Sequence, residues 1–319
     1  MVLPKFAFFN GRILPYEDTR VGLLTHALNY GTGCFAGLRA YWNAEENELF
    51  VFRALDHFIR FLDSTRLLAM DFPYTPENLR DHLLELLRRE GERRDCYIRP
   101  LAFLSEETIG VGLMSLSPAL SIVAFPFGKY LDREQGAHMT ISSWRRIEDN
   151  VIPARGKISG GYVNSALAKL DAQRAGFDDA ILLDSRGRVS EGTVANIFMV
   201  RRGELVTPPV TDSVLEGITR RTVIELARRE LGLPVVERSI DRTELFVAEE
   251  VFFAGTGIEV MPVSRIDHRT IGVSPVGEIT GRIRHLYFEA VRGKLPAYRG
   301  WCEPVFAGAV RAEAGVGIA

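Results

Sequence analysis

Lys157 is the residue of this chain whose type and setting point most directly to chemistry. Only five of the 39 basic residues are lysines, and the others are arginines. Lys157 lies among small residues in the stretch RGKISGGY. A lysine amine can lose its proton and attack a carbonyl carbon, whereas a guanidinium cannot. The stretch therefore indicates either a reactive amine or a loop lysine without a chemical role.

Two glycine-containing segments could bind a phosphate group. Gly217-Ile218-Thr219 lies where a helix is expected to begin, so it offers N–H groups, the positive end of the helix dipole and a hydroxyl. Gly255-Thr256-Gly257 offers a second backbone turn with a hydroxyl. Neither segment matches the Walker or Rossmann patterns, so a nucleotide is not indicated.

Glu191 adds a carboxylate to the lysine and the phosphate segments, and the combination suggests pyridoxal phosphate. This cofactor needs a Schiff-base lysine, a partner for its pyridine nitrogen and an anion site for its phosphate. An anionic partner such as Glu191 keeps the ring nitrogen protonated. The ring can then accept the electrons that are released when the substrate loses its α-proton.

Tyr97 and Arg99 are two residues apart in CYIRPLAFL, which reads as a strand. Side chains at this spacing leave the same face of a strand. A guanidinium matches the geometry of a carboxylate, so the pair could bind a substrate carboxylate. A surface pair on an edge strand has the same spacing and remains the alternative.

The first half of the chain is expected to contain two helices and several strands. We predict a hairpin over residues 5–15 that turns at Asn10-Gly11, a strand over 49–52, helices over 54–70 and 76–92, and strands over 96–104 and 120–127. The apolar side of the first helix would carry Leu55, Phe58, Ile59 and Leu62. Arg60 lies beside that side, where an arginine usually faces solvent.

The second half is expected to contain strand pairs joined by tight turns, with helices outside them. We predict a strand over 138–144, a helix over 164–176, paired strands over 179–184 and 187–192, a hairpin turning at Arg202-Gly203, a helix from Gly217, and two strands around Gly255–Gly257. This order predicts an α+β fold rather than a doubly wound sheet. The glycine-rich, charged segment 128–137 predicts a connector between an N-terminal domain, 1–127, and a C-terminal domain, 138–319, that carries Lys157.

Composition limits the classes of function. The chain has 319 residues, 46% of them hydrophobic, and a formal net charge of −2. It lacks a basic block and a long apolar run, so we expect neither nucleic-acid binding nor a membrane span. The three cysteines have no metal spacing or disulfide framework, and the start lacks a signal-peptide pattern, which together predict a cytoplasmic protein. The six histidines have no ligand spacing, so no metal is expected.

Six motifs occur in a familiar order between FFNG and GWCEPV: NYGTGCFAGLRAY, YIRP, KISGGY, VSEGTVANIF, PPVTDSVLEGITR and FFAGTGIEVMPV. With them the chain resembles the class IV (fold type IV) pyridoxal phosphate aminotransferases, and most closely the branched-chain amino acid aminotransferases. The resemblance implies a two-domain α+β fold, with a small N-terminal domain and a larger pseudobarrel domain. It also implies pyridoxal 5'-phosphate as the cofactor and a homodimer or larger assembly with sites at the subunit interface.

The resemblance further implies a role for each candidate residue. Lys157 would carry the cofactor and act as the general base and acid that moves the α-proton. The other cofactor contacts would be Tyr162 at the phenolic oxygen, Glu191 and Asn196 at the pyridine nitrogen, and Arg60, Ile218, Thr219 and Thr256 at the phosphate. The substrate carboxylates would bind Tyr97, Arg99 and the turn at Thr256 and Gly257. The apolar pocket would be lined by Tyr30, Phe35, Phe127 and Tyr130, with Val111 in a loop from the neighbouring subunit.

The implied reaction moves the amino group of L-leucine, L-isoleucine or L-valine to 2-oxoglutarate, giving 2-oxo acids and L-glutamate. D-amino-acid transaminase, (R)-selective amine transaminase and aminodeoxychorismate lyase share the fold and remain alternatives. A non-catalytic cofactor carrier would predict a degraded amine, phosphate or pyridine partner. Two departures from the family concern the expected pocket wall: Ala36 replaces the glutamate of Phe-Glu-Gly-x-Arg, and Phe127 replaces a tryptophan of many bacterial relatives.

Overall fold

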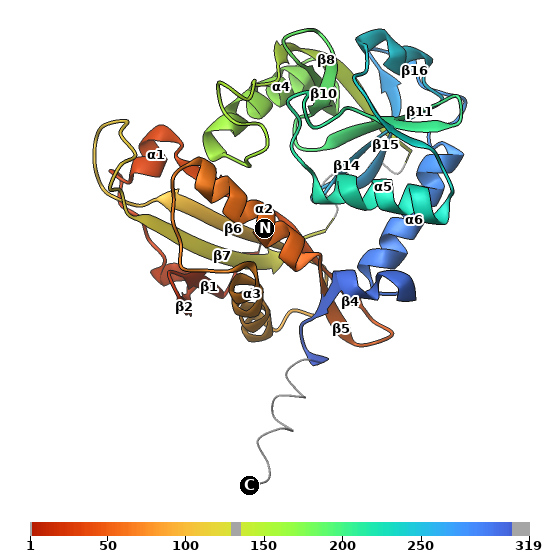
Figure 1. Cartoon of the computed structure of the whole chain (residues 1–319). Coiled ribbons are helices and arrows are strands. Elements are labelled where there is room, and N and C mark those ends of the chain that lie inside the picture. Colours follow the sequence, from red (N-terminus) through yellow and green to blue (C-terminus); the bar gives the residue numbers. More distant parts are fainter. Residues whose placement is uncertain (1, 129–134, 308–319) are drawn as a thin grey trace. The chain divides into compact units, whose positions relative to one another are not determined.

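The computed structural model describes residues 2–128 and 135–307 of the chain (Figure 1). These residues form two compact units. The first unit comprises Met1–Gly128, Gly156–Gly160 and Glu289–Ala319, and the second comprises Lys129–Arg155 and Gly161–Phe288, each as far as it is described. This division differs from the predicted domains in two segments, because Gly156–Gly160 and the C-terminal segment from Glu289 group with the first unit.

An antiparallel sheet forms the first unit, with the strand order β17-β5-β4-β6-β7-β1-β2 and with β3 paired to β6. Its strands are β1 (Phe6–Phe9), β2 (Arg12–Pro15), β3 (Gly33–Phe35), β4 (Leu38–Asn43), β5 (Glu48–Phe52), β6 (Cys96–Leu104), β7 (Pro118–Pro126) and β17 (Cys302–Pro304). Its helices are η1 (Tyr16–Asp18), α1 (His26–Tyr30), α2 (Ala54–Leu67), α3 (Pro76–Glu90) and η4 (Pro296–Trp301). The predicted hairpin at Asn10-Gly11 is confirmed, and both turn residues have positive φ, as a two-residue turn requires.

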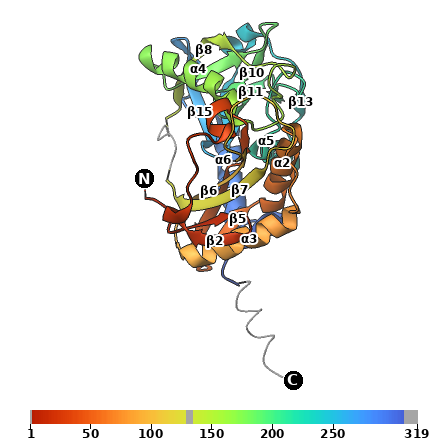
Figure 2. The same ribbon diagram turned by 90° about the vertical axis from the view of Figure 1, so that its left-hand side faces the viewer.

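Helices α2 and α3, which are labelled in Figure 2, belong to the first unit. Their apolar side chains are buried in its core. Phe58 and Leu62 of α2 and Leu83 of α3 are buried, as predicted. Ile59 is 49% exposed, so its predicted place on the apolar side is wrong. Phe61 is buried instead, because the buried stripe of α2 lies one residue further round the helix.

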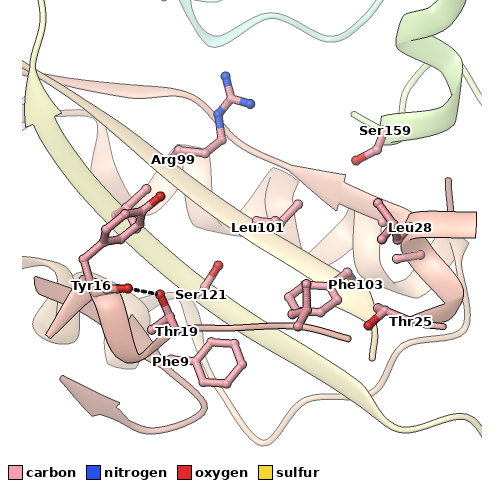
Figure 3. A pocket seen from close by; sticks show the side chains of 15 residues that line it. Phe9, Tyr16, Thr19, Thr25, Leu28, Arg99, Leu101, Phe103, Ser121 and Ser159 are labelled. Atoms are coloured by element: carbon pink, nitrogen blue, oxygen red, sulfur yellow. Dashed lines mark hydrogen bonds between the residues drawn. The ribbon is translucent and has the colours of Figure 1, made fainter. Parts of the chain in front are cut away.

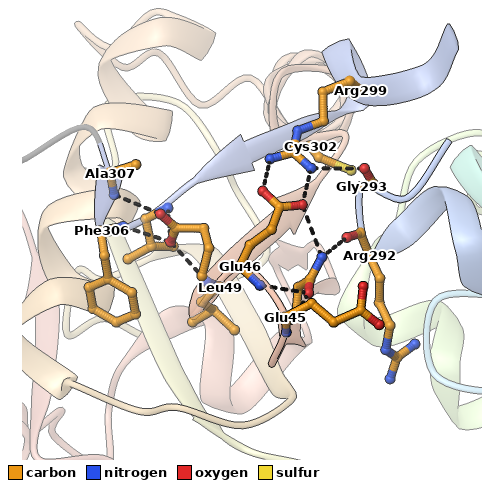
Figure 4. Close-up of polar contacts among 12 residues, drawn as sticks. Glu45, Glu46, Leu49, Arg292, Gly293, Arg299, Cys302, Phe306 and Ala307 are labelled. Carbon is orange, nitrogen blue, oxygen red and sulfur yellow. Dashed lines mark hydrogen bonds and ion pairs between the residues drawn. The ribbon is translucent and has the colours of Figure 1, made fainter. Parts of the chain in front are cut away.

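Two distant segments join the first unit through main-chain pairing. Strand β17 extends the sheet beside β5. The buried carboxylate of Glu48 accepts hydrogen bonds from the backbone N–H groups of Val305, Phe306 and Ala307, and Figure 4 shows the surrounding contacts. The other segment carries Lys157, whose carbonyl accepts a hydrogen bond from the N–H of Phe35 (3.0 Å). Sequence patterns do not reveal pairings over such separations.

In the second unit a sheet closes on itself. Strand β10 pairs with both β9 and β11, so the order β10-β9-β8-β15-β14-β11 forms a closed ring, which β12 and β13 extend. The strands are β8 (Ala137–Arg145), β9 (Asp179–Leu183), β10 (Val189–Gly192), β11 (Asn196–Arg201), β12 (Glu204–Thr207), β13 (Val235–Glu237), β14 (Glu250–Gly255), β15 (Glu259–Ile266) and β16 (Arg269–Thr270). The predicted α+β fold with a barrel-like sheet is confirmed.

The helices of the second unit lie outside this ring (Figure 1). They are α4 (Tyr162–Arg174), α5 (Ile218–Glu230), η3 (Arg242–Val247) and α6 (Glu278–Val291), which crosses the boundary at Phe288, while η2 (Ser159–Gly161) begins in the first unit. The inside of the ring is filled by apolar side chains such as Ile181, Ile197 and Phe253. Over the described residues, none of the helices has the length and apolar character needed to cross a membrane.

Candidate active site

Lys157 lies in a short segment that is anchored to the first unit on both sides. Its backbone N–H donates a hydrogen bond to the hydroxyl of Ser64 in α2 (3.2 Å), and that hydroxyl donates to the carbonyl of Arg60 (2.9 Å). Gly160 approaches Gly31 so closely that a Cβ on residue 31 would lie 2.9 Å from the Cα of Gly160. The backbone around the lysine is therefore held at defined points, which restricts where the half-buried side chain can reach.

The aromatic ring of Phe35 brings three candidate residues together. The Nζ atom of Lys157 lies 5.1 Å from the centre of this ring, and the Cζ atom of Arg99 lies 4.3 Å from it. Arg99 also donates a hydrogen bond from Nη2 to the hydroxyl of Tyr97 (3.0 Å). Within the described residues, the buried Nε of Arg99 has no hydrogen-bond partner. A guanidinium with an unused donor suits a carboxylate, and the amine contacts the same aromatic ring.

Phe127 and Ala36, the two residues that depart from the family pattern, have different surroundings. Phe127 lies next to Tyr97, with ring centres 5.3 Å apart, so it belongs to the neighbourhood of the Tyr97–Arg99 pair. Ala36 is 1% exposed and packs in the apolar core of the first unit. The expectation that Ala36 forms part of a pocket wall is therefore wrong, because its methyl group contacts core side chains instead of open space.

A cavity of about 420 Å³ lies in the first unit over strands β6 and β7 (Figure 3). Its lining is mostly apolar, with Leu101, Phe103 and Leu28 among the contributing side chains. Arg99 and Ser159, which is two residues after Lys157, also line it. An apolar space of this size with a few polar groups is typical of a small-molecule site.

Glu191 is the central acid of the second unit, and it is 5% exposed. Its Oε2 accepts hydrogen bonds from Nδ2 of Asn196 (3.0 Å) and from the backbone N–H of Leu215 (3.2 Å). Its Oε1 forms an ion pair with Nε of Arg146 (2.9 Å). The predicted association of Glu191 with Asn196 is present. A buried carboxylate held by charged and neutral donors can present a fixed negative charge to a protonated ring nitrogen.

The N-terminus of α5 begins at Ile218 and Thr219, as predicted, after Gly217 as the N-cap. The N-cap residue is a glycine, so it offers no side chain to cap this end by a hydrogen bond. The first N–H groups of a helix have no intrahelical acceptor, and the helix dipole adds positive potential there. The end of α5 can therefore accept an anion such as a phosphate. Thr256 and Gly257 lie in the turn between β14 and β15, within the same unit.

The remaining predicted residues lie at several positions. The hydroxyl of Tyr30 accepts a hydrogen bond from the N–H of Gly110 (2.9 Å), next to Val111, which is 79% exposed. The structure thus joins Tyr30 to the loop of Val111, whereas the sequence placed only Val111 in a separate loop. Tyr162 is the first residue of α4, and Arg60 is half-buried on α2. Tyr130 lies outside the described residues.

A cysteine nucleophile is not indicated. Cys34, Cys96 and Cys302 are all buried, and burial raises the pKa of each thiol to about 12. The reactive form of a cysteine is the thiolate, which is scarce at neutral pH for such groups.

Comparisons with known proteins agree with this geometry. The profile of the family Amino-transferase class IV matches residues 33–266. A probable branched-chain-amino-acid aminotransferase of Aquifex aeolicus is 45% identical over 94% of this chain and 97% of that protein. The branched-chain aminotransferase of Thermoproteus uzoniensis, solved with norvaline, has a TM-score of 0.91 and 43% identity over 95% of this chain and 100% of that chain. The holo-form enzyme of Thermobaculum terrenum has a TM-score of 0.90 and 39% identity over 95% of this chain and 99% of that chain.

The chain therefore belongs to the class IV aminotransferases. Within that class, the proteins it is similar to are named as branched-chain enzymes. The cofactor of the class is pyridoxal 5'-phosphate, and the residues present here fit this group. In the second unit, the helix start after Gly217 offers N–H groups of the kind that a phosphate needs, and buried Glu191 offers a carboxylate of the kind that a ring nitrogen needs; in the first unit, Lys157 supplies an amine.

Sequence reasoning missed Ser64, Leu215 and Arg146. Ser64 and Leu215 act through a hydroxyl or a backbone group that many residues could supply, so their types carry no signal. Arg146 is one of many arginines, and it comes 45 positions before its partner Glu191. Its place two residues after the predicted strand over 138–144 is the only hint that the sequence offers.

Proposed function

We propose that this protein transfers the amino group of branched-chain L-amino acids to 2-oxoglutarate, giving branched 2-oxo acids and L-glutamate. The observation that carries the proposal is the cluster of Lys157, Phe35, Arg99 and Tyr97. It combines an amine, an arginine with an unused buried donor and an aromatic surface in one place. An α-amino acid carries its carboxylate one bond from the carbon that reacts, so it matches this cluster. The names of the relatives support the branched-chain assignment.

When bound, pyridoxal phosphate supplies an electron sink for the α-carbon of the substrate. Lys157 would act as the base that removes the α-proton and as the acid that returns it. Tyr97 and Arg99 would orient the substrate by its carboxylate. Aromatic Phe35 would exclude water from the reacting carbon.

The other residue roles are proposals that follow the resemblance. The cofactor would be held by Tyr162, Glu191, Asn196, Arg60, Ile218, Thr219 and Thr256. The turn at Thr256 and Gly257 would also receive a substrate carboxylate. Phe127 would limit the side-chain pocket beside Tyr97. Aliphatic side chains are favoured because the cavity next to Arg99 is lined mainly by apolar groups.

An apolar patch on the first unit supports assembly into at least a dimer. We define this patch by Leu23, Leu28, Ile109, Val111 and Met114, which are between 62% and 92% exposed. Large apolar side chains with this exposure are typical of interaction sites. A second copy of the chain would cover the patch, and Tyr30 and Val111 would contribute to the pocket of that copy. Ile109→Glu is expected to lower the mass measured by light scattering, whereas Val273→Glu, at a fully exposed position of the second unit, is expected to leave it unchanged.

We place the protein in the cytoplasm. All three cysteines of the chain are free thiols, as a reducing compartment would keep them.

An amino-donor screen tests the function. The purified holoenzyme would receive L-leucine, L-valine, D-alanine or (R)-1-phenylethylamine, each with 2-oxoglutarate or pyruvate, while the cofactor absorbance is followed. We expect turnover with L-leucine and L-valine and with 2-oxoglutarate. Lys157→Ala should abolish it, and Lys294→Ala, which removes a lysine paired with Glu45, should not. Preferential turnover of D-alanine or the (R)-amine would overturn the substrate assignment in favour of the alternative activities of the fold.

A further inference from the structure

Arg146 is a charged residue of the second unit that lies beside Glu191. Its Nε lies 2.9 Å from Oε1 of Glu191, and the two side chains are only 12% and 7% exposed. The second oxygen of Glu191 is held separately, by Asn196 and by the N–H of Leu215. Hydrogen bonds therefore hold one oxygen of the carboxylate, and Arg146 brings a full positive charge to the other.

The backbone places Arg146 without help from its side chain. Arg146 follows β8, and its N–H donates a hydrogen bond to the carbonyl of Leu183 at the end of β9 (2.8 Å). Strand β9 pairs with β10, which carries Glu191. The pairing of β8, β9 and β10 thus sets the distance between the two side chains. A substitution at position 146 can keep the hydrogen bond from its backbone N–H to Leu183.

Burial makes the charge of Glu191 depend on its partners. A carboxylate that is removed from water without an opposite charge tends to take up a proton. Removing one member of a buried ion pair is also far more harmful than removing both, because it leaves an uncompensated charge. Asn196 and Leu215 provide hydrogen bonds but no net charge. Arg146 brings the opposite charge that favours the ionised form of Glu191 at this depth.

We propose that Arg146 is a positioning residue for Glu191: it holds the carboxylate charged and oriented, so that the carboxylate can accept the N–H of a protonated pyridine ring. The inference rests on the proposed function for the role of Glu191, but the ion pair belongs to the protein alone. Arg146 would thereby act on the cofactor only through Glu191.

The apo-protein gives the first test, because it requires neither cofactor nor substrate. Melting temperatures would be compared at pH 8 and pH 5.5 for the wild type, Arg146→Met, Glu191→Gln and the double variant. We expect Arg146→Met to melt lower than the wild type at pH 8, with a smaller difference at pH 5.5, where a proton can neutralise Glu191. Adding Glu191→Gln to Arg146→Met should restore part of the loss, since the uncompensated charge is then gone.

Arg145→Met is the matched control. Arg145 is the neighbouring residue, is exposed, and donates to the carbonyls of Asp184 and Ser185 instead of to Glu191. We expect the difference in melting temperature between Arg145→Met and the wild type to be the same at pH 8 and at pH 5.5. A purely structural role of Arg146 would give equal losses at both pH values and additive effects in the double variant, and that result would overturn the inference.

Cofactor binding gives the second test. Pyridoxal phosphate should bind Arg146→Met about 10-fold or more weakly, as for partners that orient a ligand-binding side chain. The pH at which the absorbance of the bound cofactor changes should shift by about one unit, and Arg146→Lys should recover part of both effects. Unchanged affinity and spectrum in Arg146→Met would refute the role. A protein that fails the donor screen but shows the coupling in the apo form would contradict the proposed function and leave the ion-pair inference standing.

Discussion

Replacing Gly217 by alanine is expected to disturb both Asn196 and the start of α5 with one methyl group. A Cβ at this position would lie 2.0 Å from Oδ1 of Asn196 and 3.2 Å from Cβ of Arg220. Asn196 is itself fixed, because its Nδ2 donates to Glu191 (3.0 Å) and to the carbonyl of Leu215 (2.9 Å). Either the side chain of Asn196 or the backbone at the start of α5 has to move.

The two routes have comparable costs. Turning Asn196 away gives up a hydrogen bond to a charged group and one to a carbonyl, about 2–4 kcal/mol together. Shifting the start of α5 is a case of overpacking, which costs about 1–3 kcal/mol. The cheaper route limits the loss, so we expect about 1–3 kcal/mol of unfolding free energy. For a unit of this size that corresponds to a fall in melting temperature of roughly 2–12 °C.

The assay is thermal unfolding of the apo-protein, followed by titration with pyridoxal phosphate. Gly281→Ala serves as control: this residue lies within α6, and the nearest atom to its added Cβ is 4.0 Å away. Alanine is a better helix residue than glycine by about 0.5–1 kcal/mol, so the control should be as stable as the wild type or slightly more stable. A Gly217→Ala protein with the melting temperature and cofactor affinity of the wild type would refute the reasoning.

Three further predictions each depend on one contact. A Cβ at residue 37 would lie 2.2 Å from the hydroxyl of Tyr97. Gly37→Ala should therefore raise the KM for the amino donor about 10-fold, which corresponds to about 1.4 kcal/mol. An unchanged KM would count against the proposal that Tyr97 binds the substrate carboxylate. Hydrogen bonds from Arg238 lower the pKa of Glu244 from 4.5 to about 2. The Glu244 carboxylate therefore stabilises the fold above pH 4.5, and this contribution is lost as the pH falls towards 2. The urea midpoint of Glu244→Gln should be lower than that of the wild type at pH 7 and should change less between pH 4.5 and pH 2. Glu48→Gln replaces an oxygen that accepts hydrogen bonds from backbone N–H groups of the segment around Val305. It should lower the free energy of unfolding by about 1–3 kcal/mol and speed proteolysis after residue 301. Equal digestion rates for the variant and the wild type would disprove this.

Much of the local structure follows from short-range patterns. The turn at Asn10-Gly11 needs residues that tolerate positive φ, and the helix from Gly217 follows from a glycine before a periodic apolar pattern. Lys157 and Glu191 could be singled out because the proposed chemistry demands an amine and a carboxylate, which few other side chains can replace. In these cases the residue type itself carries the information.

Other features depend on contacts that no local pattern records. The predicted apolar side of α2 included Ile59, which is exposed, because the sheet decides which stripe of the helix is covered. Ala36 was expected in a pocket wall, and it lies in the core because β3 and β4 turn this position towards the packed side chains. Arg146 meets Glu191 only through the pairing of β8, β9 and β10.

The sequence by itself therefore determined the reaction class, through the amine, the acid and the helix start proposed to bind phosphate, since each depends on the chemistry of single residues and their near neighbours. The tertiary structure alone decided which groups surround that chemistry: Phe35 and Arg99 around Lys157, and Arg146 beside Glu191. The physical reason is that charge compensation and ring contacts act over a few ångströms of space, whereas strand pairing brings together residues that lie tens of positions apart in the chain.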